Sequence, residues 1–285
     1  MKPPRRLRRR QRKMLLVHIL LMVSTAVLVA PVLWAVLLSV RPTPVLLSGL
    51  GSILSTQLTL DNYQILFTRY NTTRFLVNSF IGAAVPAVIA VVVGFVSGYS
   101  IVRFRFRAAA TFQSMPLFAQ VVPAILIVLP LYSAMLFLGL LNTYAGIIVA
   151  HTALVLPLAV WLMAGYLRSI PVEIEEAAMV DGCTRLGAIL RVLLPISLPG
   201  VAATGMVAFV NAWGEFVFAF VLVSGDALRL MSVAVLLFVP SGQTPTTWGL
   251  LFAAAVTFML PSLLLFPLLQ RLIAKGVTAG SVQGF

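Results

Sequence analysis

The sequence predicts an all-α protein that crosses a membrane several times, and its composition and apolar runs point to this class. The chain has 285 residues, of which 61% are hydrophobic and only 9% are charged, whereas a soluble domain has roughly 25% charged residues. Several apolar runs exceed the ~18 residues that mark a membrane-spanning helix. So few polar groups cannot cover a compact water-soluble enzyme of this size. We therefore predict a polytopic membrane protein.

Six apolar segments are long enough to cross a hydrocarbon core of ~30 Å at ~1.5 Å per residue. These segments, the predicted transmembrane helices, run over 14–38, 75–101, 111–138, 145–167, 200–223 and 247–270. An even number of spans returns the chain to the side on which it started. We therefore divide the chain into a basic cytosolic arm over 1–13, a transmembrane domain over 14–270 and a cytosolic tail over 271–285.

Positive charge is concentrated on one predicted side of the membrane. The net charge is +13, and eight of the twenty Lys and Arg residues precede residue 14. No aromatic residue interleaves them, which argues against a nucleic-acid-binding arm and favours contact with anionic lipid. With the arm in the cytosol, sixteen of the twenty cations fall in cytosolic segments. This distribution satisfies the positive-inside rule and predicts that both termini are cytosolic.

Two outer connections, 39–74 and 224–246, are less regular. In the first, Thr59 or Asp61 is a candidate cap for a short surface helix. The second is rich in Gly, Pro and Thr around a short apolar stretch. We interpret it as an external loop that dips toward the membrane.

The third predicted span contains three prolines seven residues apart, at 116, 123 and 130, with Gln113 and Gln120 on a neighbouring stripe. Proline removes a helical hydrogen bond, and a membrane tolerates this only where protein or water satisfies the freed carbonyl. Two interpretations stay open. The span is either a bent packing helix or a helix that bends and lines a passage.

The chain lacks the residues for catalysis or metal binding. Its two histidines, His18 and His151, have no second ligand at metal-binding spacing. The only lysines are Lys2, Lys13 and Lys275, and none lies in a phosphate-binding G-x-x-x-x-G-K-[ST] loop. We therefore expect no metal, no cofactor and no enzymatic activity in this chain.

The cytosolic connection over 168–199 holds four of the seven acidic residues. Pro171 is suited to a first helical position, and the acids that follow it complement the helix dipole. Two alanines then give a smooth surface, and Gly182 is suited to a helix end. This pattern predicts a short surface helix that enters a groove in a soluble partner. A solvated surface loop is the alternative.

The same connection carries a recognisable pattern. It reads Glu176-Ala177-Ala178, then Gly182, Val192 and Leu194-Pro195. This pattern resembles the signature of inner-membrane permease subunits of ATP-binding-cassette (ABC) importers. Three further runs resemble the carbohydrate-uptake, maltose-permease-like branch of these permeases: 138–144, 211–216 and 276–284. Departures are mild, with Val192 where isoleucine is usual and Cys183 where alanine is common.

The resemblance implies a type I ABC importer permease fold, in a bacterial or archaeal cytoplasmic membrane, that moves a sugar or related solute inward. It implies a second permease, of a different sequence, an extracytoplasmic solute-binding protein and two ATP-binding subunits that hold ATP and Mg. The residues that it implies for docking to the ATPase are Glu175, Glu176, Ala177, Ala178, Asp181, Gly182 and Pro195, with Gly276, Thr278, Ala279 and Gly280 as a tail contact. The alternatives are a polyamine or phosphate importer and a stand-alone channel or secondary carrier.

Glu215 is the one acid inside a predicted span, and a charge at mid-membrane normally faces protein or water. On one continuous helix it shares a face with Thr204 and Asn211. These residues, together with Gln113 and Gln120, are the candidate solute passage. The alternative for Glu215 is a structural or gating bond to a neighbouring helix.

Overall fold

The computed structural model is helical throughout and holds no β-strand over the residues that it describes, which are 5–42, 46, 57–104, 122–240 and 248–280. The predicted all-α class is therefore confirmed. Five helical segments in these ranges are long and apolar enough to cross a membrane: Met14–Ser39, Thr72–Arg103, Tyr144–Arg168, Arg185–Trp213 and Trp248–Pro267.

The third predicted span is represented by a shorter apolar helix, α7 (Ala124–Phe137). Gln113, Pro116 and Gln120 lie outside the described residues. The count of six spans therefore stays a prediction.

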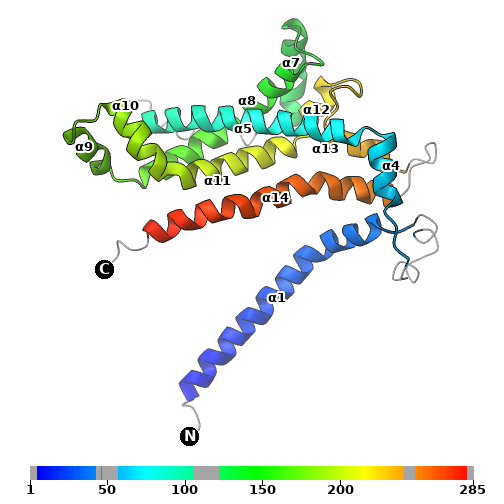
Figure 1. Cartoon of the computed structure of the whole chain (residues 1–285), viewed down its shortest axis with the longest axis horizontal. Coiled ribbons are helices and arrows are strands. Elements are labelled where there is room, and N and C mark those ends of the chain that lie inside the picture. Colours follow the sequence, from blue (N-terminus) through cyan, green and yellow to red (C-terminus); the bar gives the residue numbers. More distant parts are fainter. Residues whose placement is uncertain (1–4, 43–45, 47–56, 105–121, 241–247, 281–285) are drawn as a thin grey trace. The chain divides into compact units, whose positions relative to one another are not determined.

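The chain divides into two compact units, which we describe separately. Unit 1 comprises 1–70 and 237–257, and unit 2 comprises 71–236 and 258–285. Unit 1 contains α1 (Arg5–Ser39) and α4 (Asp61–Arg69), drawn in blue shades in Figure 1.

Within unit 1, α4 is fastened to the end of α1. The amide of Asn62 donates to the carbonyls of Ser39 and Arg41, at 2.8 and 3.0 Å. These bonds satisfy carbonyls that the end of α1 leaves without helical partners. Neither predicted cap residue is the N-cap of α4, because that position is Leu60 and it makes no side-chain cap bond. The hydroxyl of Thr59 accepts a hydrogen bond from the N–H of Asp61, the first residue of the helix, at 3.1 Å.

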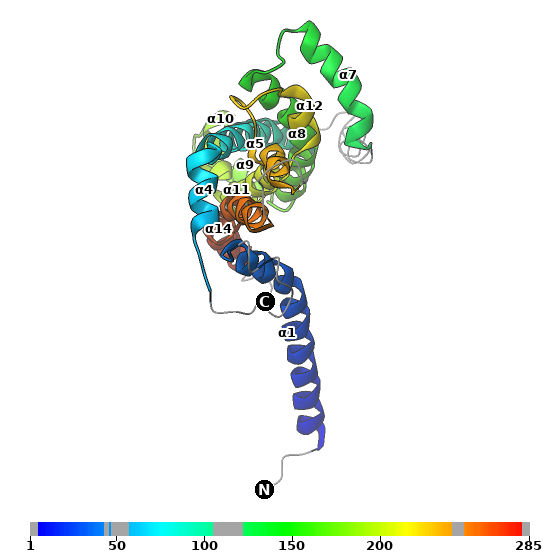
Figure 2. The same ribbon diagram turned by 90° about the vertical axis from the view of Figure 1, so that its right-hand side faces the viewer.

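The centre of unit 2 is a bundle of three helices, α5 (Thr72–Arg103), α8 (Tyr144–Arg168) and α11 (Leu194–Trp213), which pack on one another (Figures 1 and 2). Two glycines let α5 approach α8 closely. A Cβ atom added at Gly98 would lie 2.8 Å from the backbone nitrogen of Ala164, and one at Gly94 would lie 3.1 Å from the carbonyl of Ala159. Small residues four apart bring membrane helices together in this way.

Aromatic rings close the bundle on the side of α14 (Trp248–Gly280). The ring of Trp213 stacks between those of Phe209 and Phe258, with both centroid separations at 5.6 Å. Its indole N–H donates to the carbonyl of Phe258 at 3.0 Å. Trp213 is therefore a core residue, and it is buried.

The fifth predicted span is not one helix, which corrects the prediction of a helix over 200–223. A π-helical turn over Ile189–Leu193 leads into α11, so the helix begins before residue 200. It then ends at Trp213, and α12 (Val217–Leu222) resumes after a three-residue break. The mean hydropathy of the whole run stays high despite Gly214 and Glu215 in the break, so hydropathy alone did not predict the interruption.

The short helices of unit 2 lie at its two opposite ends (Figure 1). At one end are α9 (Glu173–Val180) and α10 (Arg185–Ala188). At the other are α7, α12 and α13 (Met231–Ala234). The predicted docking loop and the predicted outer loop are thus separated by the length of the bundle.

Candidate functional site

The candidate docking site is the exposed face of α9. Successive residues of a helix are turned by about 100°, so residues three and four apart share a side. Glu175 and Ala178 point inward and are buried. The opposite side is exposed, and Val180 at its centre is 88% exposed. The exposed residues of this docking face are Glu173, Glu176, Ala177, Met179, Val180, Asp181 and Gly182.

A glycine turn ends α9. Gly182 has a φ of +93°, which L side chains rarely adopt. The N–H of Cys183 donates to the carbonyl of Ala178, and that of Gly182 donates to the carbonyl of Met179, at 3.0 and 3.1 Å. This pair of bonds is the Schellman pattern of a helix end. The predicted end at Gly182 is correct, but the helix begins at Glu173, so Pro171 lies before it.

Glu175 has a different place from the one expected of a docking residue. Its carboxylate accepts a hydrogen bond from Nε of Arg103, the last residue of α5, at 2.6 Å, and both side chains are less than 10% exposed. Nη2 of Arg103 also donates to the carbonyl of Ile170, at 2.9 Å. Glu175 therefore tethers α9 to α5 and does not lie on the docking face. Glu175 and Glu176 are neighbours on a helix, so their side chains differ in direction by about 100°. Glu175 therefore points inward while Glu176 points outward.

The second half of the loop is also held in place. The hydroxyl of Thr184 accepts the N–H of Gly187 and caps α10. The guanidinium of Arg185 lies 4.8 Å from the ring centroid of Phe104, a cation–π distance. Pro195 is exposed near the start of α11. The docking loop thus contacts the bundle at several points, so a force on α9 acts on the helices beneath it.

Arg103→Gln is expected to loosen α9 without unfolding the bundle. The substitution leaves Glu175 without its charged partner, and a hydrogen bond to a charged group contributes about 1.5–3 kcal/mol. Amide hydrogen exchange over 171–182 should therefore quicken by at least tenfold. Arg191→Gln, which removes an exposed cation of the same loop, is the comparison. Equal exchange in the parent and in Arg103→Gln would contradict the tether.

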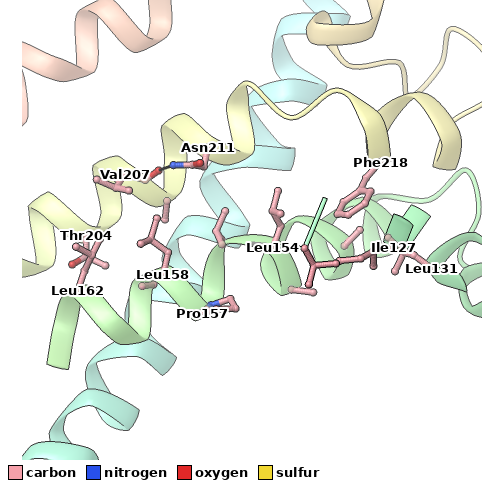
Figure 3. A pocket seen from close by; sticks show the side chains of 16 residues that line it. Ile127, Leu131, Leu154, Pro157, Leu158, Leu162, Thr204, Val207, Asn211 and Phe218 are labelled. Atoms are coloured by element: carbon pink, nitrogen blue, oxygen red, sulfur yellow. Dashed lines mark hydrogen bonds between the residues drawn. The ribbon is translucent and has the colours of Figure 1, made fainter. Parts of the chain in front are cut away.

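The candidate passage is a cavity of about 230 Å³ in unit 2, formed by α7, α8, α11 and α12 (Figure 3). Its walls are mostly apolar, and Thr204 and Asn211 of α11 are its polar lining residues. The hydroxyl of Thr204 donates to the sulfur of Met163 at 3.3 Å. The Nδ2 atom of Asn211 donates to the carbonyl of Val207 at 2.8 Å, drawn as a dashed line in Figure 3.

The structure brings two of the five predicted passage residues together. Thr204 and Asn211 share the cavity, whereas Glu215 does not line it. Glu215 lies in the break after α11, where its carboxylate accepts the N–H groups of Phe218 and Ala219. The shared helical face predicted for Glu215 is therefore wrong, because α11 has ended before that residue.

Polar side chains fasten the segment over 227–231 to α5, and no sequence pattern singled them out. The amide of Asn78 donates to the carbonyls of Ala227 and Arg229, at 3.1 and 3.0 Å. The hydroxyl of Tyr144 donates to Asn78 Oδ1 at 2.6 Å. The N–H of Met231 donates to the hydroxyl of Ser79, also at 2.6 Å. These bonds fix the segment that leads into α13.

The remaining predicted site residues lie in α14, which continues through Gly276, Thr278 and Ala279 to Gly280. Residues 281–285 lie outside the described part of the chain. Within the described residues, no three His, Cys, Asp or Glu side chains come together as metal ligands do.

Comparison with known proteins identifies the family. Residues 90–279 match the family described as "Binding-protein-dependent transport system inner membrane component". The chain belongs to this family. The match covers the docking face, the cavity lining from α8 to α12 and most of α14, and the predicted resemblance to ABC importer permeases is confirmed.

Two relatives illustrate the branch of the family. The sulfoquinovosyl glycerol transport system permease protein SmoH of Agrobacterium fabrum is 34% identical over 79% of this chain and 79% of its own length. The trehalose transport system permease protein SugB of Mycobacterium tuberculosis is 31% identical over 89% of this chain and 92% of its own. The chain is therefore a transport permease of the inner membrane.

A solved structure shares the fold of this permease. It is the crystal structure of a bacterial ABC transporter involved in the import of the acidic polysaccharide alginate. The TM-score is 0.67 with 18% identity, and the match covers 92% of this chain and 96% of that one. The predicted importer-permease fold is confirmed by this likeness.

Proposed function

We propose that this permease carries a sugar or related solute into the cytoplasm, driven by ATP that separate subunits hydrolyse. Relatives named for trehalose and diacetylchitobiose support a sugar. The exposed face of α9 carries the proposal, because it presents an acid beside small residues on a helix that is tethered to the bundle. Such a face fits a groove in a soluble partner.

In the proposed complex, Glu176 pairs with a cation in a groove of an ATP-binding subunit, and Ala177 and Gly182 permit close approach. Asp181 of the docking face and the exposed Pro195 contact the same subunit in this proposal, and the buried Ala178 supports the face from beneath. The end of α14, from Gly276 to Gly280, forms a second contact with the ATPase. Two ATP-binding subunits supply ATP and Mg, and this chain needs no cofactor of its own.

The proposed arrangement places the basic arm, 1–13, and the tail, 271–285, in the cytosol, with the transmembrane domain between them. A second permease of different sequence completes the passage, and a solute-binding protein delivers the solute from outside. Closure of the ATPase pushes α9, and the tether at Arg103 carries this push to α5. The bundle then changes the side on which the passage opens.

For the solute path itself, Asn211→Leu is expected to lower uptake severalfold with little change in thermal stability. The side chain is exposed at the cavity, and its Oδ1 atom is an acceptor that a sugar hydroxyl can use. Val207→Leu, on the same wall, is the apolar control. Radiolabelled solute uptake in proteoliposomes measures both, and unchanged uptake and selectivity in Asn211→Leu would remove this residue from the passage.

The proposed function is tested by reconstituting this permease with ATP-binding subunits, a second permease and a solute-binding protein from the same organism. We expect ATP-dependent uptake of an oligosaccharide that the binding protein recognises. Uptake of a polyamine or phosphate instead would overturn the solute class. Uptake that persists without any ATP-binding subunit would identify a channel or secondary carrier.

A further inference from the structure

The break between α11 and α12 is organised around one buried carboxylate. Glu215 Oε1 accepts the N–H of Phe218 at 2.8 Å, and Oε2 accepts the N–H of Ala219 at 3.0 Å. Oε2 also lies 3.3 Å from Nε2 of His151 on α8. The side chain of Glu215 is 5% exposed, and that of His151 is fully buried. One acid therefore both caps α12 and faces a histidine of another helix.

The other ring nitrogen of His151 holds the imidazole against α5. Nδ1 lies 2.6 Å from the carbonyl oxygen of Gly82 on α5. A carbonyl only accepts, so Nδ1 carries a hydrogen and donates it. The carboxylate accepts through both oxygens, as an ionised group does. Nε2 is left facing Oε2 of Glu215 at 3.3 Å, which makes the carboxyl group its polar neighbour in this buried site.

The two residues of the pair lie on elements of different kinds. His151 is on a long, closely packed helix, whereas Glu215 precedes a short one. A Cβ atom added at Gly82 would lie 3.2 Å from Ile147 of α8 and 3.3 Å from Leu230 before α13, so α5 is closely packed near His151. By contrast, α12 has six residues and joins α11 through a three-residue break. The chain connection alone does not set the orientation of α12 relative to α8. The pair sets it together with the apolar packing of Phe218 and Leu222 near Ala150.

We propose that Glu215 and His151 form a latch that makes α12 move as one body with α5 and α8 during transport. If α12 separated from α8, a buried carboxyl group and a buried imidazole would each lose a polar neighbour, which is costly where no water replaces it. The latch therefore restricts movement at the outer end of unit 2 to rigid-body motion. Both residues are positioning residues, and neither needs to touch the solute.

The distance between α12 and α8, measured in the assembled importer, tests the latch directly. Spin labels are placed at Phe220 on α12 and Val149 on α8, both exposed, in a Cys183→Ser background whose uptake is measured first. We expect the same narrow distance distribution without nucleotide and with ATP bound. In Glu215→Gln, which retains an acceptor for the cap but loses the charge, the distribution should broaden. A distance in the parent that changes on ATP binding would overturn the latch.

A double-mutant cycle tests the same pair through uptake, and thus also relies on the proposed function. Glu215→Gln and His151→Gln should each reduce uptake about tenfold, and the double variant should lose little more, because coupled residues are not additive. Asp226→Asn, which removes an exposed acid of the outer loop, is the control. The proposal would be contradicted if the loss of uptake in the double variant equalled the sum of the two single losses on a free-energy scale. It would also be contradicted if uptake fell only in proportion to the amount of assembled complex. The distance measurement does not depend on which solute is carried, so the latch and the solute assignment fail separately.

Discussion

Glu176→Lys is expected to leave the permease inserted in the membrane while coupled uptake falls by roughly 100-fold or more. Glu176 is exposed on the docking face beside Val180, and neither side chain has a role in the packing of unit 2. A lysine there meets the cationic groove proposed for the ATPase. A reversed charge at a desolvated contact costs several kcal/mol. The measurements are ATP-driven uptake in proteoliposomes and recovery of the ATP-binding subunits on the purified permease.

The matched control for this charge reversal is Asp226→Lys. Asp226 is exposed and pairs with Arg229, at 2.9 Å, at the end of unit 2 away from α9. Exposed pairs contribute little to stability, so this variant should transport nearly as well as the parent. Normal coupled uptake in Glu176→Lys would remove α9 from the ATPase interface.

Gly98→Val is expected to destabilise the permease by about 3 kcal/mol, at the upper end of the usual cost of overpacking. The contact at Gly98 is with backbone atoms of α8, which cannot rotate away as a side chain does. The added side chain therefore forces α5 and α8 apart along their whole contact. A fall in the thermal unfolding midpoint of the detergent-solubilised protein, together with lower yield, measures the effect.

Gly165→Val separates packing from helix propensity. Gly165 lies on α8 with no atom within 4 Å of an added Cβ, so the same substitution meets open space. Because both positions are inside helices, any change in intrinsic helix preference is shared. A midpoint as low in Gly165→Val as in Gly98→Val would show that the glycine contact is not what stabilises the bundle.

Much of the helical framework follows from apolar runs. The segment predicted over 145–167 is α8, Tyr144–Arg168, and that over 75–101 is α5, Thr72–Arg103. Length and hydropathy are properties of the chain itself, so they predict these elements well. They do not show where a helix is interrupted, and the prediction over 200–223 fails for this reason. Gly214 was a local sign of the interruption.

In the docking loop, too, local features could be predicted and long-range contacts could not. Its helix and its end at Gly182 could be predicted, because acids near a helix start and a glycine after its end act locally. The inward turn of Glu175 could not, because its partner Arg103 is 72 residues away. Likewise, His151 looks like a packing residue in the sequence, since nothing near it in the chain identifies Glu215. The spacing of Gly94 and Gly98 was an available signal for the α5–α8 contact.

The anchoring of the outer loop has a consequence for the way the chain matures. Asn78 and Ser79 bond to residues 149 to 152 positions further along. During synthesis, these two polar side chains are made long before their partners emerge from the ribosome. Water, lipid headgroups or an insertion factor must satisfy them in the interval. A chain that ends before Ala227 lacks these backbone partners of both side chains, so the contact between α5 and this segment forms only late in synthesis.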